Sequence, residues 1–119
     1  MQVCLAVQGA KRRWYLDSGC SRHMTGDKDQ FVTQEIKEGG VVTFGDNGKG
    51  QIIGIGKTQI TPSTFIENVL YVRGLRHNLI SISQLCNIGY KVSFESLLCI
   101  VTNPIDNSIV LIGNRQGNT

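Results

Sequence analysis

The sequence feature that most constrains the fold is the repeated alternation of short β-rich runs with glycine-containing turns. The clearest case is residues 41–44, a run of β-branched and aromatic residues, which leads into the turn-forming residues 45–50 and then into a second run at 51–60. Two β-rich runs joined by a glycine-rich tip are typical of a β-hairpin. The chain contains 14 glycines and only 2 prolines, which suits many tight turns rather than disorder. The sequence therefore predicts a long hairpin over 41–60, with a tip that its glycines make mobile.

The other β-rich runs continue this pattern along the chain. Strands are predicted at 14–16, 65–72, 90–94, 97–101 and 109–112, and residues 31–37 are predicted to form either a short strand or a helical turn. Residues 1–13 alternate only weakly and are interpreted as an extension or a loose edge strand, whereas the polar residues 20–30 are interpreted as a loop. The prediction is a single all-β domain.

One segment has helical rather than β character. Ile82, Leu85 and Ile88 recur at every third position, which places them on one face of a helix. Ser81 can cap the start of this helix and Gly89 can close its end. One short helix is therefore predicted within the all-β domain.

Composition and charge narrow the possible functions. The 119 residues fit one domain, and no linker, low-complexity tract or repeat interrupts them. A formal net charge of +3 is too small to indicate direct binding of nucleic acid, and the basic residues 11–13 are interpreted as a solvated flank. No run of about 18 apolar residues exists, so the sequence predicts no helix that spans a membrane.

The cysteines indicate the redox environment that we expect. The N-terminus lacks the order of charge, apolar stretch and small-residue cleavage site of a secretory signal. The four cysteines, Cys4, Cys20, Cys86 and Cys99, show no close pairing in sequence. They are therefore predicted to be free thiols in a reducing compartment.

A carboxylate directly after an apolar strand is the first candidate for chemistry. Residues 14–16 are apolar, and Asp17, Ser18 and Gly19 follow at once as the start of a turn. Ionised groups are not buried without compensation, so this Asp needs a reason to be there. From these residues alone, Asp17 either presents a carboxylate for catalysis or simply accepts hydrogen bonds from the turn that it begins.

Three longer motifs place this turn in a wider pattern. Residues 14–25 read WYLDSGCSRHMT, residues 41–60 form the expected hairpin, and residues 68–85 read NVLYVRGLRHNLISISQL. In this order the motifs resemble the retropepsin-like aspartic proteases of Copia-type LTR retrotransposon Gag-Pol polyproteins. Cys20 stands where those proteases more commonly carry Ala, a small-for-small change. Ser81 stands where other retropepsins have the Gly of their apolar-apolar-Gly motif. This difference affects the packing that the resemblance implies for the motif beneath the active-site turn.

The resemblance implies a fold, an activity and a partner. The fold is a retropepsin-like acid protease half-barrel with a flap hairpin and one short helix, homodimeric, over residues 14–112, with an extension at 1–13 and a tail at 113–119 leading toward the pre-integrase region. The activity is that of an aspartic endopeptidase acting on peptide segments of its own polyprotein. The implied place is the cytoplasm, within virus-like particles. The resemblance implies no cofactor, no metal, no membrane and no direct nucleic acid.

The resemblance also assigns residues to the site. Two carboxyls a few ångströms apart share one proton and activate a water, and the other aspartates, Asp27, Asp29, Asp46 and Asp106, are not followed by Ser/Thr-Gly. The second Asp17 must therefore come from a second copy. Ser18 is expected to brace the two turns, and Gly19 to accept hydrogen bonds from the substrate through its backbone. Substrate is expected to contact the residues after the turn and the flap: Cys20, Ser21, Arg22, Gly45, Asp46, Asn47 and Gly48.

Alternative interpretations remain. Cys20 and His23, with the distant Cys86 and Cys99, could form a zinc site, although only one close ligand pair is present; otherwise His23 is predicted to hydrogen-bond within the loop after Asp17. Ser18 or Cys20 with His23 as base is a weaker arrangement, because such close spacing rarely yields the required geometry. The main alternative is a non-catalytic or domesticated retropepsin-like module that binds peptides or dimerises, which would hold extended peptides without cleaving them.

Overall fold

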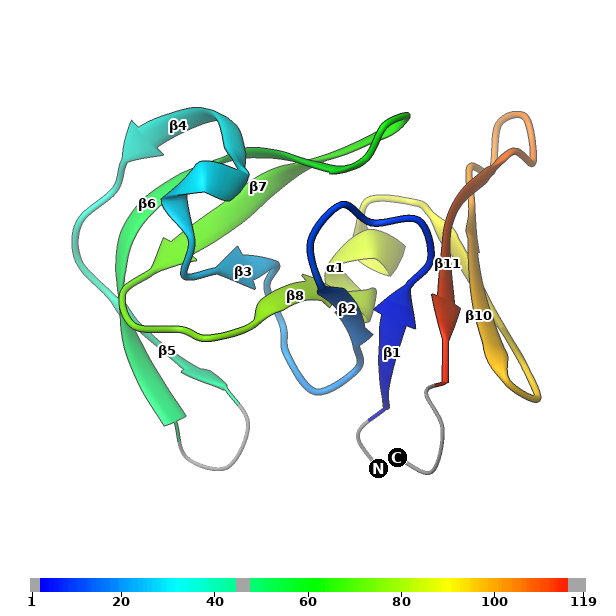
Figure 1. The fold of residues 1–119 in the computed structure, drawn as a ribbon, viewed down its shortest axis with the longest axis horizontal. Coiled ribbons are helices and arrows are strands. Elements are labelled where there is room, and N and C mark those ends of the chain that lie inside the picture. The colour runs from blue at the N-terminus through cyan, green and yellow to red at the C-terminus, as the bar shows by residue number, and fades with distance from the viewer. Residues whose placement is uncertain (1–2, 45–47, 116–119) are drawn as a thin grey trace.

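The structure has the predicted all-β architecture with one short α-helix. The computed structural model describes residues 3–44 and 48–115. Its elements are β1 (Cys4–Val7), β2 (Trp14–Asp17), β3 (Met24–Thr25), the 3₁₀ helix η1 (Lys28–Gln30), β4 (Phe31–Ile36), β5 (Val41–Phe44), β6 (Gly48–Thr61), β7 (Thr64–Val72), β8 (Asn78–Ser81), α1 (Ile82–Asn87), β9 (Lys91–Glu95), β10 (Leu98–Thr102) and β11 (Ile109–Asn114) (Figure 1). Residues 31–37, predicted to form either a short strand or a helical turn, contain the strand β4.

Three short strands form the centre of the molecule. β2 and β8 run parallel, with Leu16 opposite Ile80 and Asp17 opposite Ser81. β3 lies on the other side of β8, antiparallel to it and parallel to β7. Leu16 and Ile80 are fully buried, as expected for parallel strands covered on both faces. The central strands therefore bring the first motif (14–25) and the third motif (68–85) into register.

β3 lies within residues 20–30, for which the sequence predicts only a loop. The strand has only two residues, Met24 and Thr25, and they are 1% and 0% exposed. Two residues are too few to produce an alternating pattern, so the strand is defined by its neighbours rather than by its own sequence. The loop prediction is wrong at this point, and the following turn also contains η1.

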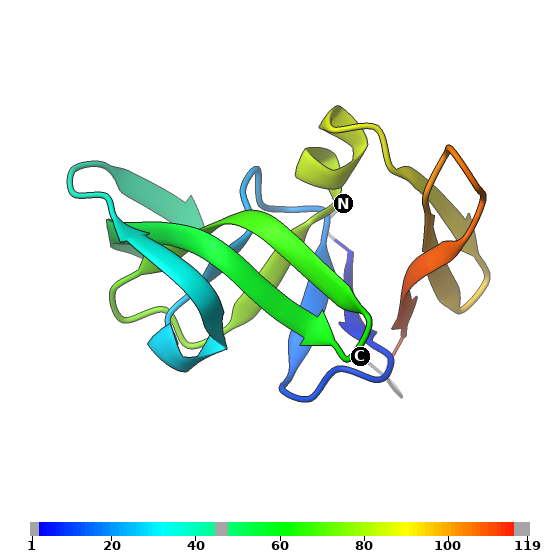
Figure 2. The ribbon, with the colours of Figure 1, turned by 90° about the horizontal axis from the view of Figure 1, so that it is seen from above.

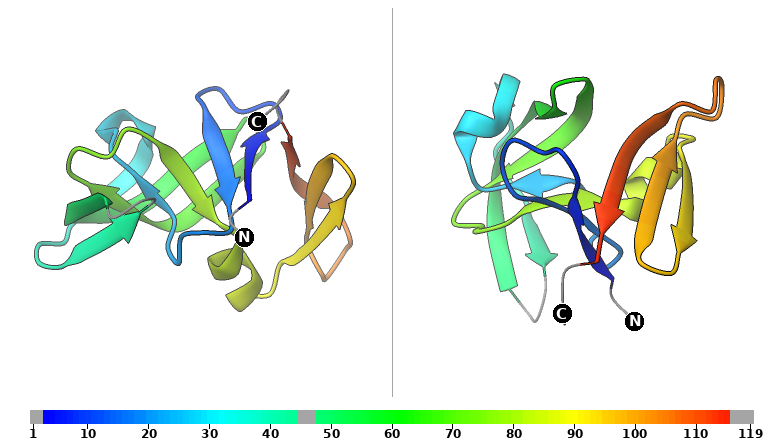
Figure 3. Two further views of the ribbon diagram at one scale, coloured as in Figure 1. Left: turned by 90° about the horizontal axis from the view of Figure 1, so that it is seen from below. Right: turned by 45° about the vertical axis from the view of Figure 1, so that its right-hand side comes forward.

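The predicted hairpin is confirmed as β5 and β6, which pair from Val41–Gln51 to Phe44–Gly48. β6 is much longer than β5, because its later part pairs with β4 on one side and β7 on the other. Residues 45–47, at the predicted tip, lie outside the described residues. Figures 2 and 3 show these strands on one side of the central strands and the β10–β11 hairpin on the opposite side.

The two ends of the described chain are built into one sheet. β1 pairs with β2 on one side and with β11 on the other, so residues 4–7 form an inner strand, and the loose edge strand that was one of the two interpretations of 1–13 is wrong for them. β11 extends through Gly113 and Asn114, which the sequence analysis assigned to the tail. A Cβ on Gly113 would lie 2.8 Å from Leu16 Cδ1, so this glycine allows the C-terminal strand to approach β2 closely. The C-terminal hairpin is thus part of the domain.

The buried side chains form two clusters. The larger joins β1, β2, α1 and the C-terminal hairpin, and includes Trp14, Leu16 and Leu85. The smaller lies beneath the β5–β6 hairpin and includes Cys20 and Met24. Each fully buried aliphatic side chain of this kind stabilises a fold by about 1.5–3 kcal/mol relative to its exposed state. Among the described residues, no helix has the length and apolar character needed to cross a membrane.

Candidate active site

Asp17 is the last residue of β2, and three segments of backbone meet around it. In the sheet it lies opposite Cys4 of β1 and opposite Ser81 of β8. Asp17 is 4% exposed, and its Oδ1 accepts a hydrogen bond of 2.6 Å from the backbone N–H of Gly19. The carboxylate therefore begins the turn that follows it. This geometry fits both roles left open by the sequence, a turn-forming Asp and a catalytic one.

Ser18 and Gly19 are exposed at the tip of this turn. The Ser18 N–H donates to the Val3 carbonyl at 2.9 Å, and Ser18 Oγ accepts from the Val3 N–H at 2.7 Å. These two bonds tie the turn to the residue before β1. The hydroxyl acts as an acceptor in this contact, so its own proton can be donated elsewhere.

The residues after the turn divide into buried and exposed. Ser21 is exposed and Arg22 is half-buried, so both can contact a ligand at the surface. Cys20 is 6% exposed and packs in the smaller core cluster. A contribution of Cys20 to substrate binding would therefore come from its backbone rather than from its thiol. The predicted substrate residue Gly48 begins β6, whereas Gly45, Asp46 and Asn47 lie outside the described residues.

His23 lies beneath the turn and hydrogen-bonds across the molecule. Its Nδ1 accepts from the Ser81 N–H at 2.8 Å, and its own N–H donates to Gln84 Oε1 at 2.7 Å. The Leu70 N–H donates to the His23 carbonyl at 2.9 Å. The prediction that His23 bonds within its own loop is wrong. Its partners lie on β7, β8 and α1, which local sequence could not indicate.

The protonation states around the turn follow from burial. Burial, and to a smaller extent the charge of Arg22, lowers the pKa of His23 to about 4. Since Nδ1 accepts a hydrogen bond, the neutral ring carries its proton on Nε2, and Nε2 has no hydrogen-bond partner among the described residues. Burial, and then the nearby Asp17, raises the pKa of the Cys20 thiol to about 12.

These states weigh against a cysteine or serine nucleophile paired with His23. A thiol with so high a pKa is not a thiolate at neutral pH, and the Nδ1 of His23 is already occupied by Ser81. The described residues also contain no group of three or more His, Cys, Asp or Glu side chains that could hold a metal ion. The zinc set considered from the sequence is not assembled in this part of the chain, where Cys20 and Cys99 are buried and Cys4 and Cys86 are exposed.

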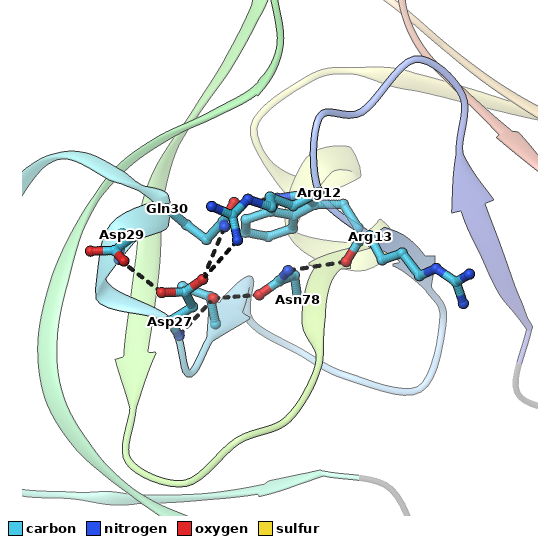
Figure 4. Close-up of polar contacts among 8 residues, drawn as sticks. Arg12, Arg13, Asp27, Asp29, Gln30 and Asn78 are labelled. Atoms are coloured by element: carbon cyan, nitrogen blue, oxygen red, sulfur yellow. Dashed lines mark hydrogen bonds and ion pairs between the residues drawn. The ribbon is translucent and has the colours of Figure 1, made fainter.

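A second polar network holds the opposite ends of the same strands (Figure 4). Asn78 at the start of β8 accepts from Thr25 Oγ1 and donates to the Arg13 carbonyl just before β2. Gln30 accepts from Trp14 Nε1 at 3.0 Å and donates to Asp27 Oδ2 at 3.2 Å. Residues 11–13 are exposed, in keeping with a solvated flank. These hydrogen bonds hold β2, β3 and β8 together at the ends of the strands remote from Asp17.

The chain is similar to parts of retrotransposon Pol polyproteins. Residues 14–90 match the family described as the Pol polyprotein beta-barrel domain. The chain is 32% identical over 99 residues to a retrovirus-related Pol polyprotein from transposon TNT 1-94 of Nicotiana tabacum, a match covering 80% of this chain and 8% of that protein. It is also 32% identical over 97 residues to the polyprotein from transposon RE1 of Arabidopsis thaliana, covering 77% of this chain and 7% of that protein.

The matches cover most of this chain but only a small part of each relative. The chain spans less than a tenth of the length of either curated relative. The family match takes in β2, the turn after it and α1, and it ends before the C-terminal strands β9, β10 and β11. No solved structure matches the chain.

Proposed function

This chain belongs to the Pol polyprotein beta-barrel domain family of retrotransposon Pol regions, and we propose that it acts there as one protomer of a homodimeric aspartic endopeptidase. The observation that carries the proposal is the position of Asp17, at the point where the parallel strands β2 and β8 end side by side. A strand end next to an exposed turn is a place where a largely buried carboxylate can still meet a ligand. The substrate class is an extended segment of the retrotransposon Gag-Pol polyprotein.

The proposed mechanism needs two copies of the chain. In the dimer, the two Asp17 carboxyls would lie a few ångströms apart and share one proton, because two carboxylates at that distance cannot both ionise. The ionised member takes a proton from a water as it attacks the scissile carbonyl, and the protonated member gives its proton to the departing amine. The reaction uses carboxyl groups and water alone.

The turn and the hairpin would provide the remaining parts. The exposed Ser18 hydroxyl, already an acceptor for the Val3 N–H, can donate its proton across the dimer axis and brace the two turns. The backbone of Gly19 and the surface residues Ser21 and Arg22 would contact the substrate. The β5–β6 hairpin would cover an extended peptide bound as an added strand.

A non-catalytic role is the second candidate, and one contact favours it. Asp17 Oδ1 accepts the Gly19 N–H, which is sufficient to account for a turn-forming Asp without any chemistry. On this interpretation the chain binds peptides or dimerises within the Pol polyprotein and leaves peptide bonds intact.

The test compares two aspartates in the same local geometry. Asp106 Oδ1 accepts the N–H of Ser108, two residues on, as Asp17 accepts that of Gly19, but it lies in an exposed turn. The wild type, Asp17→Asn and Asp106→Asn are each incubated with a polyprotein fragment that contains the segments flanking this domain. We expect cleavage by the wild type and by Asp106→Asn, and none by Asp17→Asn, because Asn cannot accept the proton of the water.

Two outcomes would contradict the proposal. Activity of Asp17→Asn within about tenfold of the wild type, equivalent to less than about 1.4 kcal/mol of transition-state free energy, would remove Asp17 from the catalytic role. Retention of intact peptide by a wild-type protein that does not cleave it would favour the binding module. Circular dichroism and sedimentation of Asp17→Asn show whether fold and dimer are retained.

A further inference from the structure

Ser81 connects three parts of the molecule directly beneath the Asp17 turn. It is 0% exposed and lies opposite Asp17 in the register of β2 and β8. Its Oγ donates to the Cys20 carbonyl at 2.7 Å and accepts from the Gln84 N–H at 3.1 Å, which caps α1. One hydroxyl therefore both begins the helix and holds the backbone of the turn.

His23 provides the second connection. Its ring accepts the Ser81 N–H, and its backbone N–H is held by the Gln84 side chain. The segment from Asp17 to His23 is thus fixed at its start by the pairing of β2 with β8 and near its end by β8 and α1. His23 is fully buried and its Nε2 has no partner among the described residues, so the ring is kept there at a desolvation cost.

The hydroxyl of Ser81 is essential to this arrangement. A glycine at this position would keep the N–H that His23 accepts, but it would leave the Cys20 carbonyl without its donor and the Gln84 N–H without its cap. A buried carbonyl without a partner is costly, so the turn would rearrange to find another donor. Any such rearrangement moves the backbone that carries Asp17.

We infer that Ser81 and His23 are positioning residues that fix the backbone of residues 17–23 and so hold Asp17 in register with its counterpart in the dimer. This inference rests on the proposed protease function. Two carboxyls share a proton only when their separation and orientation are tightly held, and small displacements of a catalytic group reduce the rate strongly. Neither residue touches the reacting atoms.

The experiment compares substitutions that keep or remove each contact. His23→Asn retains an acceptor at the position of Nδ1, whereas His23→Leu fills a similar volume without one. Ser81→Ala removes the hydroxyl. The control variants are His77→Asn at an exposed histidine and Ser96→Ala at an exposed serine in the turn between β9 and β10. For each variant, kcat and KM per folded dimer are measured well below the melting temperature, together with amide hydrogen exchange of the peptide that spans the turn.

We expect His23→Leu and Ser81→Ala to lower kcat by roughly tenfold or more, with KM within about threefold, as is usual when buried hydrogen bonds that orient a reacting group are lost. Exchange in the turn should become faster, while β10 remains protected. His23→Asn should restore most of the kcat lost in His23→Leu, and the two controls should match the wild type.

Two results would contradict the positioning role of Ser81 and His23. Unchanged kcat per folded dimer in His23→Leu and Ser81→Ala, with only a lower melting temperature, would assign both residues a purely structural role. Unchanged exchange in the turn would show that the turn is held without them. If the wild type itself cleaves nothing, the proposed function fails and the positioning role fails with it. An active wild type with unaffected variants overturns the inference alone.

Discussion

At the scale of single residues, the turn after β2 brings together side chains that differ in burial and in charge. Asp17 is largely buried yet begins an exposed turn, Cys20 packs inward, and His23 is fully buried with its ring neutral. The low pKa of His23 has a consequence for stability that can be measured without any assay of activity.

Stability should fall as the pH is lowered from about 6.5 toward 4. The pKa of His23 is about 4 in the folded chain against an ordinary value of 6.5. Between these values the unfolded chain binds a proton that the folded chain does not, so the stabilisation is complete above 6.5 and is lost as the pH falls toward 4. The shift corresponds to about 3 kcal/mol for this buried residue. Urea unfolding of the wild type at several pH values measures it.

The control for this prediction is the exposed His77. His77→Asn should show the same loss of stability between pH 6.5 and 4 as the wild type, whereas His23→Asn should show a flatter dependence. The pKa of Asp27 is lowered from 3.8, chiefly by the Asp29 N–H, so its contribution begins to be lost only at the acidic end of this window and is the same in the wild type and in both variants. An equal pH dependence in His23→Asn and the wild type would show that His23 is not the group that titrates.

At the scale of elements, the C-terminal hairpin has a partner that the sequence does not predict, because it pairs with the first strand of the chain. β11 pairs with β1, and Cys99, Val101 and Leu111 are buried in the same cluster as Trp14. Gly113 lets the strand approach Leu16. The family match ends at residue 90, yet these later strands complete the core around β2.

A chain shortened to residues 1–90 should therefore lose cooperative folding. The truncation removes β9, β10 and β11, exposes one edge of β1 and uncovers the apolar surface that Leu111 and Val101 bury. Thermal unfolding followed by circular dichroism and binding of a hydrophobic dye measures the effect. A chain that ends at residue 115 is the control and should melt as the full chain does. A sharp transition near the full-chain melting temperature in the shorter chain would show that the hairpin is dispensable.

At the scale of the whole molecule, the proposal makes activity a property of two chains. Each chain has one Asp-Ser-Gly turn, so a shared site exists only in the dimer. The site would work in its singly protonated form, and activity should follow a bell-shaped dependence on pH whose limits belong to the pair of carboxyls.

Specific activity should therefore fall on dilution, and an inactive chain should interfere with an active one. Dimers dissociate as the concentration drops below the dissociation constant, which removes complete sites. Excess Asp17→Asn mixed with wild type forms heterodimers with a defective pair, so activity should be suppressed. An excess of Asp106→Asn is the matched control and should not suppress it. Constant activity per chain well below about micromolar concentration, an affinity corresponding to about 8.2 kcal/mol, with no interference from the variant, would rule out the shared site.

Local sequence determined several parts of this protein because their information lies within a few neighbouring residues. The β5–β6 hairpin follows from two β-rich runs and a glycine-rich connection. The helix begins at its predicted cap, Ser81, and is followed by Gly89 with φ of +105°, the left-handed conformation that favours glycine. The strand that ends at Asp17 and the exposed turn after it also lay where the apolar run and the Asp-Ser-Gly residues predicted them.

Only the tertiary structure decided how these parts meet. β3 is too short to have a pattern, β1 pairs on both sides because β11 returns to it from the end of the chain, and the bonds of Ser81 to Cys20 and His23 join residues about sixty positions apart. A hydroxyl or an imidazole can hydrogen-bond to many kinds of group, and the residue type alone does not indicate which group will lie within hydrogen-bonding distance. That choice depends on which strands the burial of Leu16, Ile80 and their neighbours brings side by side, and this is a property of the whole folded chain.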